Sequence, residues 1–214
     1  MSRFVWLDGK LVPSAKATVN VQTHAIHYGS SVFEGLRAYP SPEGPKILFL
    51  DAHLKRLFAS ARMVRMEIPY THEQLSEAIK GLIRKNKHSA CYVRPICFRG
   101  DEALGVNPRR CSVRTAILTL DWSTHLGQDA LQAGVDVGVS SWRRTMPGVG
   151  LPTGKIGGQY INSQLMVMEA QDHGYAEGIA DAAHGAKVHV VHRRGVFGIT
   201  VQHSNPTTRR AGSL

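Results

Sequence analysis

The spacing of hydrophobic residues in the first 125 positions switches between the period of a strand and that of a helix. Short apolar runs rich in β-branched and aromatic residues predict strands. The first two, at residues 4–7 and 11–12, flank the turn signal Asp8-Gly9 and are typical of a β-hairpin. Further strands are predicted at residues 46–50, 91–99 and 115–122.

Two stretches between these strands repeat apolar residues at the spacing of an amphipathic helix. The first helix is predicted at residues 53–66, with Asp51 as its N-cap. The second begins near Thr71, where Gln74 stands at the spacing of a capping box. The expected buried stripes are Leu54, Leu57, Ala61 and Val64 in the first helix, and Leu75, Ala78, Ile79, Leu82 and Ile83 in the second.

A second group of elements follows. Valine alternates with other residues at 135–142 and predicts a strand, and the Pro/Gly-rich stretch 146–154 predicts an irregular loop. A helix is predicted at 160–173, ending at Gly174.

These patterns indicate an α+β fold in which a small N-terminal α+β domain is followed by the beginning of a larger second domain. A polar, glycine-containing segment separates the two. The expected divisions are the small domain at 1–126, the interdomain link at 127–134, the start of the larger domain at 135–180 and a tail at 181–214.

The composition is that of a soluble globular protein, with 43% apolar and 20% charged residues. No apolar run is long enough for a transmembrane helix, and the first residues do not resemble a secretory signal. The cysteines, Cys91, Cys97 and Cys111, lack metal-ligand spacing and are expected to be buried thiols in a reducing compartment. We therefore expect a cytoplasmic protein with no membrane partner.

The formal charge of +10 raises the question of a nucleic-acid partner. The Lys and Arg residues before position 181 are scattered over predicted helical faces, and no groove-reading motif accompanies them. This distribution favours a solvated surface, or an attraction for anionic substrates, over nucleic-acid binding.

Lys155 is the most informative residue for chemistry. A Pro/Gly-rich stretch precedes it and Gly157-Gly158 follows it, which allows the backbone to pass close to a planar ligand. A single lysine in a loop is usually a solvated surface charge, so this feature alone does not identify a site.

Three separated motifs change that interpretation. They read HAIHYGSSVFEGLRAY at 24–39, YVRP at 92–95 and GKIGGQYINS at 154–163, and they are accompanied by GVNP at 105–108 and SSW at 140–142. In this order the motifs closely resemble the branched-chain amino acid aminotransferases, which belong to the fold type IV enzymes that use pyridoxal 5'-phosphate (PLP). The resemblance covers most of residues 4–180.

The resemblance implies PLP-dependent transamination of branched-chain L-amino acids (Leu, Ile and Val) with 2-oxoglutarate or glutamate. Lys155 matches the catalytic lysine, which forms a Schiff base with PLP and moves a proton between substrate and cofactor. Arg56 matches the arginine that binds the PLP phosphate, for which a planar guanidinium is well suited. Tyr160 matches the tyrosine beside the phenolic oxygen of the cofactor ring.

The resemblance also places seven residues around the substrate pocket. They are Tyr28, Phe33, Gly35, Tyr92, Arg94, Val106 and Trp122. The apolar members suit a branched aliphatic side chain, and Arg94 suits the dicarboxylate substrate. The family often has Tyr in the segment after Trp122, where this chain has His125, so the substrate preference is less securely implied than the cofactor. The family forms homodimers whose neighbouring subunits share pocket residues, which implies a homodimer or higher homo-oligomer here.

The resemblance stops near residue 180. The family continues into a Glu-Gly-Ser-Gly-type segment and the rest of the large domain, whereas residues 181–214 hold four His and five Lys or Arg. We interpret this tail as the product of a reading-frame change, with a natural divergent ending as the alternative. The histidine spacing matches no metal-ligand pattern, so no metal is expected. On this interpretation the 214-residue chain binds PLP weakly or not at all and is inactive.

Two other functions stay open at this point. A D-amino acid aminotransferase or an aminodeoxychorismate lyase would share the fold, although HYGSSVFEGLRAY and YVRP favour the branched-chain type. A non-catalytic fragment that folds or dimerises without PLP would belong to a different functional class.

Overall fold

The structure is a computed structural model of the 214-residue chain. It describes residues 3–121, 133–145, 148–181, 189–190 and 209–210. The chain divides into two compact units: the first is Met1–Ser123 with Thr153–Gly158, and the second is Thr124–Pro152 with Gln159–Leu214. The segment around Lys155 therefore packs with the N-terminal unit, although the sequence pattern assigns it to the start of the larger domain. The boundaries at 127–134 and 181 stay predictions.

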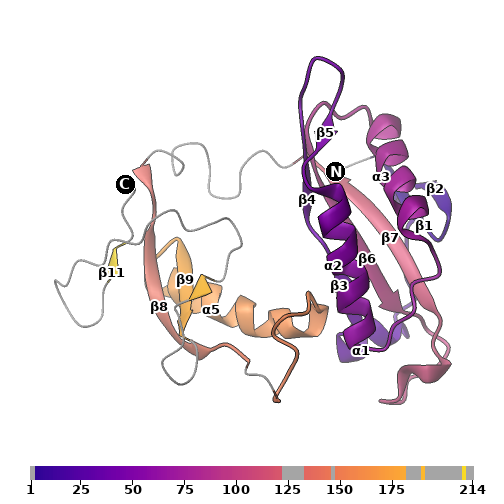
Figure 1. Cartoon of the computed structure of the whole chain (residues 1–214). Coiled ribbons are helices and arrows are strands. Elements are labelled where there is room, and N and C mark those ends of the chain that lie inside the picture. Colours follow the sequence, from indigo (N-terminus) through magenta and orange to yellow (C-terminus); the bar gives the residue numbers. More distant parts are fainter. Residues whose placement is uncertain (1–2, 122–132, 146–147, 182–188, 191–208, 211–214) are drawn as a thin grey trace. The chain divides into compact units, whose positions relative to one another are not determined.

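An antiparallel sheet forms the centre of the first unit (Figure 1). Its described strands are β1 (Phe4–Leu7), β2 (Lys10–Pro13), β3 (Ser31–Phe33), β4 (Leu36–Tyr39), β5 (Lys46–Ile47), β6 (Cys91–Arg99) and β7 (Val113–Leu120). They lie in the order β2-β1-β7-β6-β4-β5, and β3 also pairs with β6. β6 is thus the strand against which both β3 and β4 are placed, and it positions the residues between them.

Most of the predicted strands are present, with small shifts in their ends. The β1–β2 hairpin turns at Asp8 and Gly9, which have φ angles of 45° and 88° as a tight two-residue turn requires. β6 has the predicted bounds. The strand predicted at 46–50 ends at Ile47 because the following helix begins earlier than expected, and the strand predicted at 115–122 begins at Val113 and ends at Leu120.

Two long helices, α2 (Leu50–Met63) and α3 (His72–Asn86), cover one face of this sheet (Figure 1). Shorter helical turns are α1 (His24–Tyr28), η1 (Ser14–Lys16) and η2 (Pro108–Arg110). The helices bury Leu54, Leu57, Ala61, Leu75, Ile79, Leu82 and Ile83 against Val32, Leu36, Val93 and Ile117 of the sheet. The two predicted apolar stripes are therefore confirmed as the core, with Ala78 and Val64 at its partly buried margin.

The start of α2 corrects the sequence prediction. The N-cap is Phe49, in a left-handed conformation with φ of 53°, and Asp51 lies inside the first turn. Asp51 pairs there with Lys55 at 2.8 Å, and a carboxylate in the first turn also interacts favourably with the helix dipole. The start of α3 is as predicted, because Thr71 and Gln74 make both hydrogen bonds of a capping box.

The second unit contains a β-α-β arrangement. β8 (Asp136–Arg143) and β9 (Glu177–Asp181) pair in parallel, and α5 (Tyr160–Asp172) lies between them in the chain after the turn η3 (Gly157–Gln159). Two short strands, β10 (His189–Val190) and β11 (Arg209–Arg210), pair with β9 and β8. Helix α5 follows the prediction and is succeeded by Gly174 with φ of 81°, while β8 is displaced by one residue from the predicted strand.

All three cysteines are free and buried, as expected. Burial raises the pKa of the Cys91 thiol to about 11 and that of the Cys97 thiol to about 12. No helix in the described part of the chain is long and apolar enough to cross a membrane.

Candidate active site

The backbone of Lys155 is held between β3 and α2. Its carbonyl oxygen accepts a hydrogen bond from the Phe33 N–H at 3.1 Å, and its own N–H donates to Ser60 Oγ at 3.0 Å. The next residue, Ile156, forms an antiparallel bridge with Val32. Because both backbone polar groups of Lys155 are bonded, the start of its side chain has a defined place in the first unit.

The glycines after Lys155 allow this close approach. The Gly158 N–H donates to the carbonyl oxygen of Gly29 at 3.1 Å, and Gly29 has φ of 63°. A Cβ at Gly29 would lie 2.6 Å from the Gly158 Cα, and a Cβ at Gly157 would lie 2.1 Å from Ser31 Oγ. In this structure the glycines approach the chain that leads into β3, so their small size serves the packing of the lysine segment.

The ring of Phe33 is the common neighbour of two cationic groups. Lys155 Nζ and Arg94 Cζ each lie 4.6 Å from its centroid. Arg94 also donates hydrogen bonds from Nε and Nη2 to Tyr92 Oη, at 3.2 Å and 2.9 Å. The structure therefore brings four of the predicted residues together: Phe33, Tyr92, Arg94 and Lys155. Gly35 adjoins them, since its Cα faces the Tyr92 hydroxyl.

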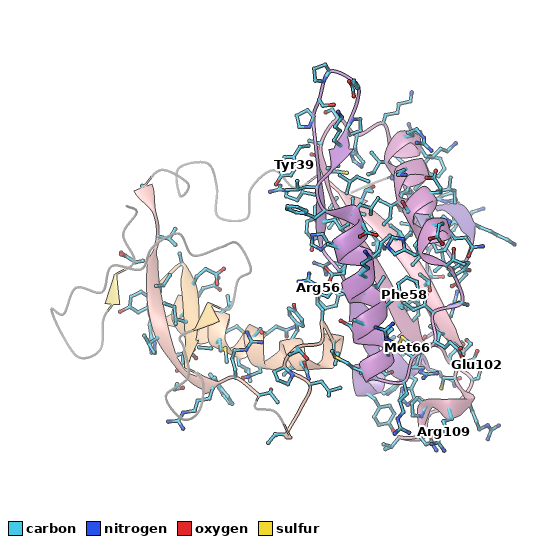
Figure 2. All side chains as sticks on the ribbon, viewed as in Figure 1. Tyr39, Arg56, Phe58, Met66, Glu102 and Arg109 are labelled. Carbon is cyan, nitrogen blue, oxygen red and sulfur yellow. The ribbon has the colours of Figure 1, made fainter. Side chains whose placement is uncertain are left out.

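Arg56 lies on α2, one helical turn before Ser60 (Figure 2). Its guanidinium donates from Nε and Nη2 to the two carboxylate oxygens of Glu34, the residue that directly follows Phe33. The Glu34 side chain is fully buried, whereas 35% of the Arg56 side chain is exposed. One part of the guanidinium is thus fixed from the interior while another part reaches the surface, where it is suited to bind an anion.

Glu34 is held as a carboxylate by its neighbours. Burial acts to raise the pKa of this group, but hydrogen bonds from His53 and Arg56, together with the charge of Arg56, lower the pKa to about 2. His53 Nδ1 lies 2.9 Å from Oε2 of Glu34, and the Gly35 N–H donates to the same oxygen at 3.2 Å.

Tyr28 and Val106 form a second group at the surface of the first unit. The Tyr28 hydroxyl donates to the Leu104 carbonyl oxygen at 2.8 Å, and the ring of His24 lies 4.6 Å from the Tyr28 ring. His24 Nε2 also contacts the Gly105 carbonyl oxygen at 3.0 Å. Tyr28 is 46% exposed and Val106 is 78% exposed. These two predicted pocket residues thus share a loop whose backbone is fixed but whose apolar side chains face outward.

Two predicted site residues lie elsewhere. Tyr160 is the first residue of α5 and belongs to the second unit. Trp122 lies outside the described residues, as does the neighbouring His125. Their roles stay predictions.

Sequence reasoning missed three residues that the structure places around Lys155 and Arg56: Glu34, His53 and Ser60. One signal for them exists, because His53, Arg56 and Ser60 recur at helical spacing beside the apolar stripe of α2. No local pattern identifies Glu34 as their partner. Among the described residues, no group of three or more His, Cys, Asp or Glu is placed to hold a metal ion.

Comparison with known proteins places this arrangement in a family. The family described as Amino-transferase class IV matches residues 31–185, which include Phe33, Arg56, Arg94 and Lys155. The chain belongs to the class IV aminotransferases. A curated relative, the branched-chain-amino-acid aminotransferase of Escherichia coli (strain K12), is 42% identical over 178 residues, covering 83% of this chain. The chain spans 58% of the length of that relative.

Solved structures of this family have the same fold as the chain. The branched-chain amino acid aminotransferase of the organism abbreviated T.th., with pyridoxamine 5'-phosphate, is 40% identical, with a TM-score of 0.83 over 88% of this chain and 63% of that chain. Two further structures of the T.th. enzyme are 38% identical, with a TM-score of 0.80 over 87% of this chain and 61% of those chains. One is complexed with N-(5'-phosphopyridoxyl)-L-glutamate and the other with 4-methylvaleric acid.

Proposed function

We propose that this chain carries the cofactor lysine of a PLP-dependent aminotransferase that acts on branched-chain L-amino acids, with 2-oxoglutarate or glutamate as the partner substrate. One observation carries the proposal: Lys155 is anchored by both backbone groups between β3 and α2, the elements that also present Phe33 and Arg56. The class IV family and the named relatives support the same activity.

The residues present fit PLP by their chemistry. The cofactor needs an amine that can react with its aldehyde, a cation for its phosphate and an apolar surface beside its ring. Lys155, Arg56 and Phe33 are of these types and share the first unit. Arg56 is suited to the phosphate because its guanidinium is partly exposed and planar. Tyr160 is the residue that we propose beside the phenolic oxygen.

When bound, PLP supplies the electron sink that allows a proton to leave the substrate Cα. Lys155 would hold the cofactor covalently through Nζ and, once released, would use the same amine to accept and return that proton. Because its backbone is bonded to Phe33 and Ser60, the amine would return to the same place in each half-reaction.

We propose that the substrate pocket combines an apolar wall with one cation. Phe33 supplies an aromatic face and Arg94 supplies a guanidinium bonded to Tyr92. This combination suits a pocket that accepts an aliphatic side chain in one half-reaction and a carboxylate in the other. The T.th. structures complexed with 4-methylvaleric acid and with a phosphopyridoxyl-glutamate favour these two substrate types over a D-amino acid or aminodeoxychorismate.

We also propose a homodimer. Exposed apolar side chains gather near α1 and the loop before η2: Ile26, Tyr28, Leu104 and Val106. The resemblance to the family assigns Tyr28 and Val106 to the substrate pocket, and a pocket residue must be covered to exclude water. Replacing Val106 with Asp should shift the protein towards the monomer in light scattering, whereas the same change at exposed Val19 should not.

The activity test uses a chimaera in which residues 1–180 are joined to the part of the E. coli relative that follows the matched region. We expect this protein to transfer the amino group of leucine to 2-oxoglutarate. Lys155→Ala should reduce turnover by several orders of magnitude, while replacing exposed Lys55 with Ala should leave it unchanged.

A second measurement locates the cofactor. Borohydride reduction in the presence of PLP should place the pyridoxyl group on Lys155 and not on Lys55. Equal labelling of the two lysines, or normal turnover by Lys155→Ala, would contradict the proposal. The 214-residue chain is measured in parallel, and stoichiometric PLP in that chain would contradict the weak binding predicted from its tail.

A further inference from the structure

Glu34 is a buried carboxylate that the proposed chemistry does not use directly. Its side chain is fully buried, and removing a carboxylate from water costs several kcal/mol unless partners compensate. The partners are complete: Arg56 donates to both oxygens, and His53 and the Gly35 N–H contact Oε2. A charge held this completely in the interior specifies the geometry of whatever it binds.

The position of Glu34 in the chain links it to the candidate active site. It follows Phe33, whose N–H bonds to Lys155 and whose ring lies below Lys155 Nζ. Its own N–H donates to the Pro95 carbonyl oxygen on β6 at 2.9 Å, which fixes its backbone. Two consecutive residues at the end of β3 therefore set the places of Lys155 and Arg56.

We propose that Glu34 is a positioning residue, which holds the guanidinium of Arg56 in the orientation that binds the phosphate of the cofactor. His53 completes the arrangement by donating to Oε2 of Glu34 from the solvent side of α2, where its side chain is 25% exposed. This inference rests on the proposed function, because it assigns the phosphate to Arg56.

The charges make the proposal testable by the direction of the effect. Glu34 neutralises the formal charge of Arg56, so a purely electrostatic role would weaken the attraction for a phosphate. Removing the Glu34 charge would then tighten phosphate binding. A positioning role has the opposite consequence, because an arginine without its buried partner loses its fixed orientation and must be ordered each time a ligand binds.

The experiment compares PLP with pyridoxal, which lacks the phosphate, in the chimaera described above. The measured quantity is the ratio of the two dissociation constants, obtained from cofactor absorbance. Arg56→Ala should reduce the preference for PLP by about tenfold or more, as expected for the loss of a charge-assisted hydrogen bond. Glu34→Ala should reduce it by a similar factor, and Glu34→Gln, which keeps the shape and one acceptor oxygen, by less.

The matched control is Glu43→Gln, at an exposed glutamate of the same unit that pairs with Lys46. It should leave the preference for PLP unchanged. If Glu34→Ala does not fold, Glu34→Gln and His53→Phe decide the matter, since each removes one part of the arrangement. A preference that stays at the wild-type level, or rises, in both variants while Arg56→Ala lowers it would overturn the positioning role and leave the proposed function standing.

A second readout needs no cofactor and uses the 214-residue chain. The Nε–H of Arg56 donates to a buried carboxylate, so its proton should exchange slowly with water in a nitrogen-15 spectrum. Exchange should become fast in Glu34→Ala and remain slow in Glu43→Gln. Fast exchange in the wild-type chain would overturn the inference. Failure of the wild-type chimaera to bind PLP, with Arg56 Nε–H still protected, would instead remove the proposed function.

Discussion

Gly35 faces the hydroxyl of Tyr92 with no room for a side chain, because a Cβ at position 35 would lie 2.0 Å from Tyr92 Oη. The same hydroxyl accepts two hydrogen bonds from Arg94. Since Glu34 and Gly35 are adjacent, the short link between β3 and β4 sets both the partner of Arg56 and the space that the Tyr92–Arg94 pair occupies. A substitution at Gly35 therefore acts on Arg94 through Tyr92.

The first prediction is that Gly35→Ala destabilises the folded chain by about 1–3 kcal/mol, since the tyrosine must move away from a methyl group in a packed site. Urea unfolding measures the loss. Gly81→Ala is the control, because Gly81 lies in α3 with open space around it. That change should stabilise the chain by roughly 0.5–1 kcal/mol. Equal stabilities of the two variants would show that Tyr92 does not constrain position 35.

The second prediction separates the two substrates of the proposed reaction. In the active chimaera, Arg94→Ala should lower kcat/KM for 2-oxoglutarate by roughly 10- to 100-fold and that for leucine much less, because only the carboxylate loses ionic hydrogen bonds. Tyr92→Phe is the matched control, since it removes the hydroxyl that Arg94 contacts and keeps the positive charge. Equal losses for both substrates in Arg94→Ala would remove Arg94 from this role.

The third prediction concerns acid stability. The pKa of Glu34 is about 2 in the folded chain against an ordinary value of 4.5, so its carboxylate stabilises the fold above pH 4.5. That contribution, roughly 3 kcal/mol, should be lost as the pH falls from 4.5 towards 2. Glu34→Gln should be less stable than wild type at pH 6, and the difference should shrink at low pH. Parallel curves from pH 6 to pH 2 would contradict the assignment.

The fourth prediction concerns the thiols. Because burial raises the pKa of Cys91 to about 11 and that of Cys97 to about 12, neither thiol is ionised at pH 8 in the folded chain. A disulfide reagent should therefore react slowly with both, and rapidly with all three cysteines after unfolding in guanidinium chloride. Rapid reaction of Cys97 in the native chain would mean that the strand β6 opens readily.

Features that depend on neighbouring residues could be predicted from the sequence. The Asp8-Gly9 hairpin and the capping box at Thr71 were both confirmed, because each is specified within a few positions. Phe49 shows the limit of this reasoning. Asp51 has the composition of an N-cap, but α2 begins at Leu50 because the chain leaving β5 turns at Phe49 in a left-handed conformation.

The sequence by itself determined the family, the lysine and the two amphipathic helices, since motifs and periodicity are written in the order of the residues. Only the tertiary structure decided that Lys155 packs with β3 and α2, and that Arg56 is held by Glu34. The reason is physical. A buried carboxylate gains its stability from whichever donors the fold brings to it, and those donors stand far away along the chain on a helix whose own pattern records burial but not partners.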